Sequence, residues 1–208
     1  GDLAGYGFGG FAGFAVSSEK FLVPKPAGLS FEEAAAMPMA SVTALQALRN
    51  KGNIRAGQEI LILGSSGGVG TFALQLARHY GAVVTAVCST RNVEQTALLG
   101  AEHVIDYTKE DFAARKRKYD LILAVNGNYS FFKCRKALKP DGRFVLVGGA
   151  LTQIFKSIVL GRPLSLGRRK MLFLAAKPNS GDLKYLLNLA SDGIIKPVIE
   201  KYYPPEKT

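Results

Sequence analysis

The chain has 208 residues, 48% of them hydrophobic, which is enough to bury one sizeable core and excludes a disordered protein. Its apolar runs are far shorter than the roughly 20 residues that cross a bilayer, and no basic and apolar leader opens the sequence, so we expect a cytoplasmic protein without a membrane partner. The formal net charge of +11 favours anionic partners. Because no aromatic residues alternate with the basic runs, solvated surfaces explain this charge better than nucleic-acid binding, which is the lesser alternative.

Two helices are expected ahead of the first strand. Ser30 and Glu33 have the spacing of a capping box before an alanine-rich helix, and Pro38 should end or kink that helix. A second helix then carries Thr43 to Leu48 and stops at Gly52.

From Gln58 onward, short apolar runs alternate with helical segments, which predicts an α/β fold with a doubly wound parallel sheet of the Rossmann type. The runs are mostly Val, Ile and Leu, as expected where helices cover both faces of a sheet. The expected strands are Glu59 to Leu63, Val83 to Val87, His103 to Ile105, Asp120 to Ala124 and Arg143 to Val147, with a sixth at Met171 to Ala175. The expected helices are Gly68 to Tyr80, Val93 to Leu99, Tyr129 to Leu138 and Leu183 to Ala190.

Several residues are expected to end or begin these elements. Asn92 and Gln95 resemble a capping pair. Gly81, Gly100 and Gly142 lie where a residue with left-handed backbone conformation would end each helical unit before the next strand. Both ends of the sequence look cut from a longer chain.

A glycine-rich turn, Gly64-Ser65-Ser66-Gly67-Gly68-Val69-Gly70, leads from the first expected strand directly into a helix. Such a turn lets the backbone approach a pyrophosphate, whose charge the N–H groups and dipole of the helix receive. Gly67 would permit this approach, and Gly70 would let helix and strand pack tightly. The G-x-G-x-x-G spacing has Ser65 in place of a glycine, so the fingerprint is a variant, but the strand and helix around it favour a phosphate site over a merely tight turn.

The second expected strand ends at Ser89-Thr90-Arg91, with no acidic residue. An NAD-preferring site places a carboxylate there for the ribose hydroxyls, whereas hydroxyl donors and a guanidinium suit a 2′-phosphate. NADP(H) is therefore the expected cofactor. Taken alone, Arg91 is equally well explained as an exposed arginine at the start of a helix.

Several segments match one known family in the family's own order. They are Lys25-Pro26, Ser30 to Ala36, Val42 to Leu48, Gly67 to Gly70, Leu99 to Ala101, Val104 to Tyr107, Val147 to Gly149 and Lys177 to Asn179. On these segments the chain resembles the zinc-independent, quinone oxidoreductase-like members of the medium-chain dehydrogenase/reductase superfamily. The resemblance implies a Rossmann domain over residues 41–177. Residues 1–40 and 178–208 would be remnants of a second, mainly β catalytic (GroES-like) domain, most of whose amino-terminal lobe and carboxyl-terminal end are absent.

The resemblance also implies cofactor contacts. Thr43 matches a position beside the nicotinamide, and Tyr107 matches one on the adenosine side, with loop packing as an equal alternative. Asn126, Gly127 and Gly148 match turns after the fourth and fifth strands. The full expected set is Thr43, Ser66, Gly67, Gly68, Val69, Gly70, Ser89, Thr90, Arg91, Tyr107, Asn126, Gly127 and Gly148.

No metal site is expected. Zinc-dependent relatives use Cys, His and Glu ligands and a separate four-cysteine lobe, and neither pattern is visible. Cys88, Cys134, His79 and His103 are better explained as structural or exposed residues. Leu123 to Asn128 carries alanine where relatives commonly have an aspartate, so cofactor binding is better supported than turnover.

The function implied is NADPH-dependent hydride transfer to a quinone or an activated carbonyl or alkene, with alcohol or enal reduction as a variant. No catalytic acid is identified. The alternative is a non-catalytic NADP-binding or interaction module with nucleic-acid affinity through the basic runs. A homo-oligomer, most simply a dimer, is expected because Leu151, Ile154, Phe155 and Ile158 are apolar beyond what the sheet needs.

Overall fold

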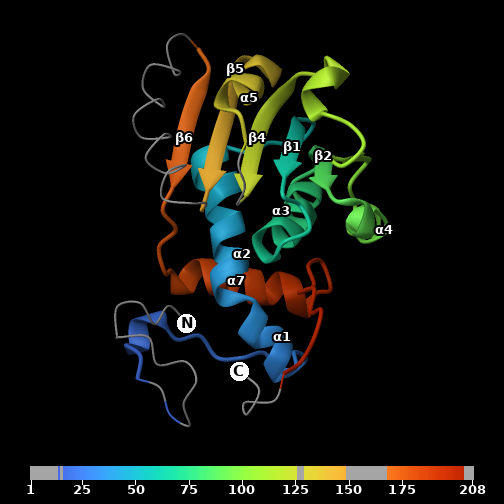
Figure 1. Cartoon of the computed structure of the whole chain (residues 1–208). Coiled ribbons are helices and arrows are strands. Elements are labelled where there is room, and N and C mark those ends of the chain that lie inside the picture. Colours follow the sequence, from blue (N-terminus) through green and yellow to red (C-terminus); the bar gives the residue numbers. More distant parts are fainter. Residues whose placement is uncertain (1–13, 15, 126–128, 149–167, 204–208) are drawn as a thin grey trace.

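The computed structural model describes residues 14, 16–125, 129–148 and 168–203, and in these residues six parallel strands form one sheet (Figure 1). The strands are β1 (Glu59–Leu63), β2 (Val83–Cys88), β3 (His103–Asp106), β4 (Tyr119–Val125), β5 (Leu138–Val147) and β6 (Lys170–Leu174). Their order across the sheet is β3-β2-β1-β4-β5-β6. This is the order of a doubly wound dinucleotide-binding fold, so the predicted fold class is confirmed.

α-Helices connect β1 to β2, β2 to β3 and β4 to β5, and further helices precede β1 and follow β6 in the sequence. The α-helices are α1 (Phe31–Ala36), α2 (Pro38–Leu45), α3 (Gly68–His79), α4 (Val93–Leu98), α5 (Phe131–Ala137) and α7 (Ser180–Ser191). A π-helix, η3 (Gln46–Gly52), continues α2, and short 3-10 turns form η2 (Glu19–Phe21), η4 (Thr90–Asn92) and η5 (Phe112–Arg115). The second predicted helix is therefore divided between α2 and the π-helix.

The predicted helix signals have mixed outcomes. The capping box is confirmed, because Ser30 Oγ accepts from Glu33 N and Glu33 Oε2 accepts from Ser30 N. Pro38 begins α2 at a position where its missing N–H costs nothing. The capping pair at the start of α4 is wrong, since Asn92 instead donates from Nδ2 to Ser89 Oγ at 3.1 Å.

The largest difference from the predicted strands is at β5. It begins at Leu138, which is fully buried and lies opposite Tyr119, so burial of this side chain draws the chain into the sheet earlier than expected and shortens α5. Gly81 and Gly100 are left-handed as predicted, with φ of 74° and 103°. Gly142 is not left-handed. It lies within β5, where a Cβ would come within 2.9 Å of the Tyr119 carbonyl oxygen.

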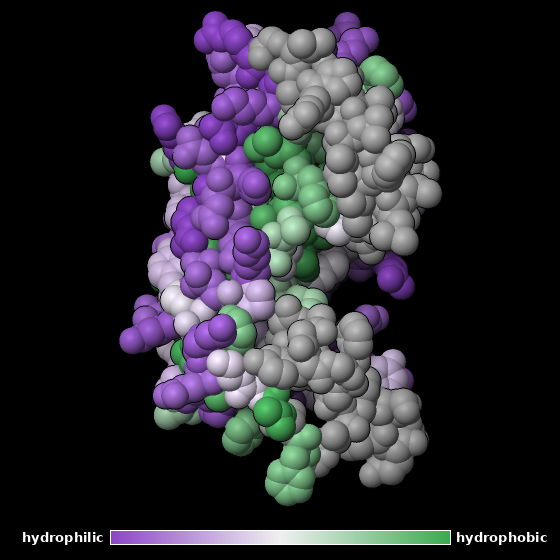
Figure 2. Space-filling model, turned by 90° about the vertical axis from the view of Figure 1, so that its left-hand side faces the viewer, coloured by the Kyte–Doolittle hydropathy of each residue, from purple (hydrophilic) through white to green (hydrophobic). Residues whose placement is uncertain are grey.

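Basic and acidic side chains form ion pairs on the surface of the protein. On the side that carries β6, hydrophilic residues form a band beside a group of apolar ones (Figure 2). Members of the basic runs pair with acids, as in Arg117 with Glu59 at 2.9 Å and Arg168 with Asp141 at 2.6 Å. Within the described ranges, no helix is both long enough and apolar enough to cross a membrane.

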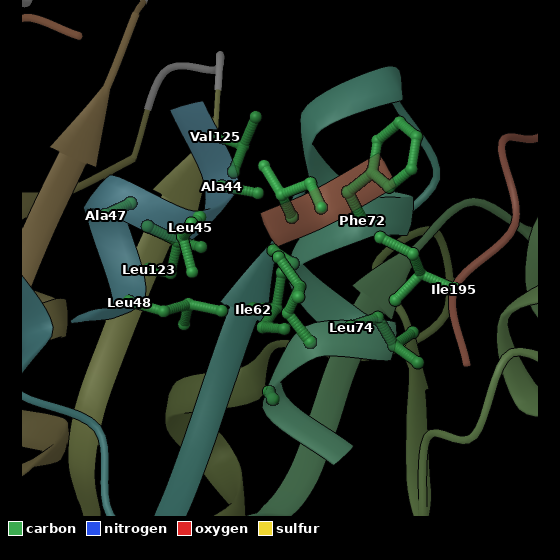
Figure 3. Close-up of a cluster of buried hydrophobic side chains, with 14 of the residues drawn as sticks. Ala44, Leu45, Ala47, Leu48, Ile62, Phe72, Leu74, Leu123, Val125 and Ile195 are labelled. Atoms are coloured by element: carbon green, nitrogen blue, oxygen red, sulfur yellow. The ribbon is translucent and has the colours of Figure 1, made fainter. Parts of the chain in front are cut away.

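Successive side chains of a strand point to opposite faces of the sheet. Because these side chains are apolar, both faces are buried under helices. Ile60 and Ile62 of β1 belong to a core cluster with α2 and α3, whereas Leu61 and Leu63 belong to a second cluster with α5. Figure 3 shows Ile62 among side chains of α2, the π-helix and α3, with Ile195 from the carboxyl-terminal segment on the far side. One face of the sheet is thus packed by elements that lie far apart in the sequence.

Two buried glutamines fix the carboxyl-terminal segment to this core. Gln46 donates from Nε2 to Lys177 O at 2.9 Å and accepts from Lys177 N at 3.0 Å. Gln75 in α3 makes the same pair with Lys196, at 2.9 and 2.8 Å. Each amide satisfies a backbone donor and acceptor that burial would otherwise leave unpaired.

We predict that Gln75→Ala lowers the free energy of unfolding by about 1–3 kcal/mol, because it leaves both polar groups of the Lys196 backbone without their partner. Gln95→Ala is the control, since Gln95 is exposed on α4 and its loss should change stability by less than about 0.5 kcal/mol. Urea unfolding followed by circular dichroism measures both. Equal stabilities of the two variants would contradict the role of Gln75.

Candidate functional site

The residues predicted to bind cofactor gather at one edge of the sheet. All strands are parallel, so their carboxyl ends meet there. Between β1 and β4 the order of connection reverses, which is where ligands bind in such sheets. The edge receives Ser66 to Gly70 after β1, Ser89 to Arg91 after β2, Tyr107 after β3 and Gly148 after β5. Asn126 and Gly127 lie outside the described residues.

Two glycines of the turn are needed for packing within the protein. Gly64 has φ of 80°, and a Cβ there would overlap the carbonyl oxygen of Val125 at the end of β4. A Cβ on Gly70 would overlap the carbonyl oxygen of Gly64 in the same way. Gly70 thus has the packing role that the sequence indicated, and Gly64 forms the tight turn although it is displaced from the usual spacing.

The other two glycines of the turn have room for a Cβ. A Cβ on Gly67 would have its nearest neighbour at 3.9 Å, and one on Gly68 would meet Ala40 Cβ at 3.6 Å. Both residues are exposed. The surface that these glycines leave is therefore accessible to a ligand that must approach the backbone closely.

Ser65 accounts for the departure from the glycine fingerprint. It is fully buried, and its Oγ donates to the carbonyl oxygen of Val87 at 3.0 Å. The backbone N–H groups of Gly64 and Ser65 donate to the same oxygen at 3.2 and 3.1 Å. Three hydrogen bonds therefore fasten the turn to β2, a contact that sequence reasoning missed because it joins residues distant in the chain.

The turn presents the amino terminus of α3, which has 12 residues. Gly67 is its N-cap and has no side chain, and no described side chain caps the helix in its place. The N–H groups of the first turn and the positive end of the helix dipole therefore point to the same edge as the open glycines. This arrangement suits a phosphate or pyrophosphate.

An acidic residue that sequence reasoning did not assign to the site lies at the end of β3. Asp106 is opposite Cys88 of β2 and only 8% exposed. Its Oδ2 accepts from Thr90 Oγ1 at 2.6 Å, and its Oδ1 accepts from Thr108 Oγ1 at 2.7 Å and Thr108 N at 3.0 Å. The pKa of Asp106 is lowered to about 2. The largest cause is the hydrogen bond from the Thr90 hydroxyl, followed by the bonds from Thr108 and the charge of the nearby Lys109. Asp106 is therefore ionised at neutral pH.

This contact changes the role expected of Thr90. Its hydroxyl proton is given to Asp106, so it is not available to a phosphate in this structure. Ser89 Oγ accepts from Asn92, and Arg91 is exposed and makes no ion pair with any described residue. Arg91 is the charged member of the three side chains predicted to hold a 2′-phosphate, and its donors form no ion pair with a described residue.

Three further side chains lie near this edge. Thr43 is 8% exposed and donates from Oγ1 to Met39 O at 2.6 Å within α2. Tyr107 is 63% exposed, and its N–H donates to Cys88 O at 3.0 Å. Tyr129 was not predicted. Its hydroxyl lies beside Gly64, and burial raises its pKa to about 12, so the phenol stays neutral.

Potential metal ligands are dispersed. Cys88 is buried at the end of β2, and burial raises the pKa of the Cys134 thiol in α5 to about 12. His79 and His103 lie in α3 and β3. In the part of the chain that the structure describes, no three His, Cys, Asp or Glu side chains group as metal ligands.

We predict that Gly70→Ala destabilises the protein by about 1–3 kcal/mol, because its methyl group has no space against Gly64 and Ser65. Gly68→Ala is the matched control, since its methyl group meets Ala40 at an ordinary 3.6 Å and its stability should be unchanged or increased. Thermal unfolding distinguishes them. A Gly70→Ala variant as stable as Gly68→Ala would show that the turn relaxes without cost.

The lowered pKa of Asp106 predicts a specific pH dependence. Because the folded value of about 2 lies below the ordinary 3.8, ionised Asp106 stabilises the fold above that ordinary value, and this contribution is lost as the pH falls from 3.8 toward 2. Asp106→Asn should therefore be less stable than the wild type near neutral pH, and the difference should shrink in acid. Urea unfolding over a pH series tests this, and a difference independent of pH would count against it.

Similarity to known proteins agrees with this geometry. Residues 99–208 match the family described as zinc-binding dehydrogenase. The chain is 34% identical over 214 residues to the chloroplast envelope quinone oxidoreductase homolog of Arabidopsis thaliana, covering 99% of this chain and 64% of that protein. It is 36% identical over 200 residues to the 2-methylene-furan-3-one reductase of Solanum lycopersicum, covering 95% and 46%.

A solved structure, the quinone oxidoreductase from Coxiella burnetii, superposes with a TM-score of 0.78 at 30% identity, covering 88% of this chain and 56% of that one. The chain spans 64% or less of the length of these three relatives. The description of the matched family names that family as a whole and does not by itself assign zinc to this chain. The family match, together with the six-stranded Rossmann sheet, shows that the chain belongs to the family described as zinc-binding dehydrogenase, within the medium-chain dehydrogenase/reductase superfamily.

Proposed function

We propose that the protein binds NADP(H) at the carboxyl edge of its sheet and is a zinc-independent oxidoreductase, which passes hydride to a quinone or to an activated carbonyl or alkene. The observation that carries this proposal is the exposed glycine turn of α3, which no described side chain caps, together with Arg91 after the neighbouring strand β2, which pairs with no described residue. The relatives support the reaction class, since one 34% identical over 200 residues is named an NADPH-dependent alkenal/one oxidoreductase.

The turn fits the pyrophosphate of a dinucleotide. Gly67 and Gly68 leave room for close approach, and the first N–H groups of α3 supply hydrogen bonds together with the helix dipole. Arg91 follows β2, on the side where the adenosine ribose of a dinucleotide lies in folds of this order. Its guanidinium suits a 2′-phosphate by charge and by bidentate geometry.

When bound, the nicotinamide ring supplies the hydride, and the protein supplies orientation. Ser66 to Gly70 hold the phosphates. Tyr107 lines the edge after β3, Gly148 lines it after β5, and α2 with Thr43 borders the nicotinamide side. Asn126 and Gly127 complete the predicted set. A reduced quinone takes protons from water, so this proposal requires no catalytic acid from the chain.

The division into residues 41–177 as cofactor domain, with residues 1–40 and 178–208 as parts of the catalytic domain, belongs to the same proposal. We also propose a dimer. The apolar residues on which we based it, Leu151, Ile154, Phe155 and Ile158, lie outside the described residues, and the half-buried Leu172 and Phe173 of the edge strand β6 support it. Light scattering tests this, and a monomer at micromolar concentration would contradict it. The cytoplasmic location stays a prediction, with the plastid as the alternative because three relatives are named chloroplastic and a fourth is named a chloroplast envelope quinone oxidoreductase homolog.

We predict that the protein binds NADPH more tightly than NADH, and that Arg91→Ala weakens NADPH binding about tenfold or more while leaving NADH unchanged, because a charge-assisted bond to the 2′-phosphate is lost. Nicotinamide fluorescence titration measures both constants. Arg55→Ala is the control, because Arg55 is exposed just before β1, at the opposite edge of the sheet.

Turnover is tested by NADPH oxidation with a quinone and an α,β-unsaturated ketone as acceptors. Binding without oxidation of NADPH by either acceptor would favour a non-catalytic NADP-binding module. Failure to bind either nucleotide, together with salt-sensitive binding to a polyanion, would favour the interaction module that the charge of +11 allows.

A further inference from the structure

Asp106 brings a negative charge to the corner where the proposed function places the 2′-phosphate of NADP(H). The register of β3 on β2 sets Asp106 opposite Cys88, the residue before Ser89. Its carboxylate is 2.6 Å from Thr90 Oγ1, and Thr90 is next to Arg91. A carboxylate in this corner is the feature expected of a site that prefers NADH, because it accepts hydrogen bonds from ribose hydroxyls and repels phosphate.

Most of the acceptor positions of this carboxylate are already filled. A carboxylate has about four of them. Thr108 N and Thr108 Oγ1 take the two on Oδ1, and Thr90 Oγ1 takes one on Oδ2. Lys109 Nζ lies 3.5 Å from Oδ2, where it forms an ion pair and no hydrogen bond. Asp106 therefore has one acceptor position left, on Oδ2, and the Thr90 hydroxyl holds the other position on that oxygen.

The net charge of Arg91, Asp106 and Lys109 is positive, as attraction of a phosphate requires, only because Lys109 is present. Arg91 contributes +1 and Asp106 contributes −1, so these two cancel, and Lys109 raises the sum to +1. The Lys109 side chain is 70% exposed and makes a long contact with Asp106. Its ammonium has three donors, so it is able to hold Asp106 and a phosphate oxygen together.

We propose that Lys109 is the second cation of the 2′-phosphate site, and that Thr90 is a positioning residue whose hydroxyl caps Asp106 and so keeps this carboxylate from binding the ribose of NADH. The inference rests on the proposed NADP(H) function. It assigns the preference for NADPH to the corner between the ends of β2 and β3. There Arg91 and Lys109 contact the 2′-phosphate, and Thr90 acts through its hydrogen bond to Asp106.

The first test removes one positive charge at each of two places. Lys109→Gln should weaken NADPH binding about fivefold and leave NADH binding within twofold of the wild type, which is the effect of losing one exposed ionic contact. Lys170→Gln removes the same charge at the start of β6, on the opposite edge of the sheet, and should change neither constant. Equal effects of the two variants on NADPH would overturn the role of Lys109.

The second test uncaps the carboxylate. Thr90→Val keeps the shape of the side chain but removes the hydroxyl, so Oδ2 is free to accept from a ribose and its charge is less screened. We expect weaker NADPH binding and tighter NADH binding, with the ratio of the two constants falling about tenfold. Thr90→Ser restores the hydroxyl and should restore the ratio. A ratio that is the same in the Val, Ser and wild-type proteins would overturn the role of Thr90.

The two proposals fail in different ways. If the wild-type protein binds neither NADPH nor NADH, the proposed function fails and takes this inference with it. If the wild type prefers NADPH and Arg91→Ala weakens it, while Lys109→Gln and Thr90→Val leave both constants unchanged, the inference alone is wrong. Thermal unfolding of each variant shows whether the fold is kept, and Lys109→Gln, at an exposed position, keeps the test decisive if Thr90→Val does not fold.

Discussion

The close approach of the turn after β1 to the end of β4 is the constraint on which the rest of the structure depends. Gly64 lies against the carbonyl oxygen of Val125, and Gly70 lies against the carbonyl oxygen of Gly64, so a side chain at either position would force the strand and helix apart. This packing sets the direction in which α3 leaves the sheet. As a result, the uncapped amino terminus of α3 faces the edge where the strands end, and the open glycines Gly67 and Gly68 lie beside it.

The remaining parts of the site are placed by the parallel register on either side of β1. The pairing of β2 with β1 brings Val87 to the turn, where its carbonyl oxygen receives three hydrogen bonds from Gly64 and Ser65. The pairing of β3 with β2 brings Asp106 to Thr90. The corner that distinguishes NADPH from NADH in our proposal is thus a product of strand register, because Thr90 and Asp106 are 16 residues apart in the sequence.

The face of the sheet that packs against α2 and α3 also holds the carboxyl-terminal segment. Gln46 and Gln75 each pair with the backbone of a single residue in that segment, and Leu186 and Ile195 join the core cluster that contains Ile62. Gln46 begins the π-helix that continues α2, and its amide also donates to Asp182 at 3.0 Å. The elements around α2 are therefore fixed from both the sheet and α7, which gives the edge near Thr43 a rigid border.

The sequence by itself determined the strands, the glycine turn and the capping box, because apolar runs, turn glycines and caps act through neighbours along the chain. It also placed Arg91 and Tyr107 at the right edge, since each directly follows a strand whose end was predicted. Only the tertiary structure decided that β5 begins at Leu138 and that Thr90 gives its proton to Asp106. Leu138 and Thr90 depend on partners 19 and 16 residues away, which no local pattern contains, and whether a buried side chain or a hydroxyl finds such a partner is fixed only when the strands pair.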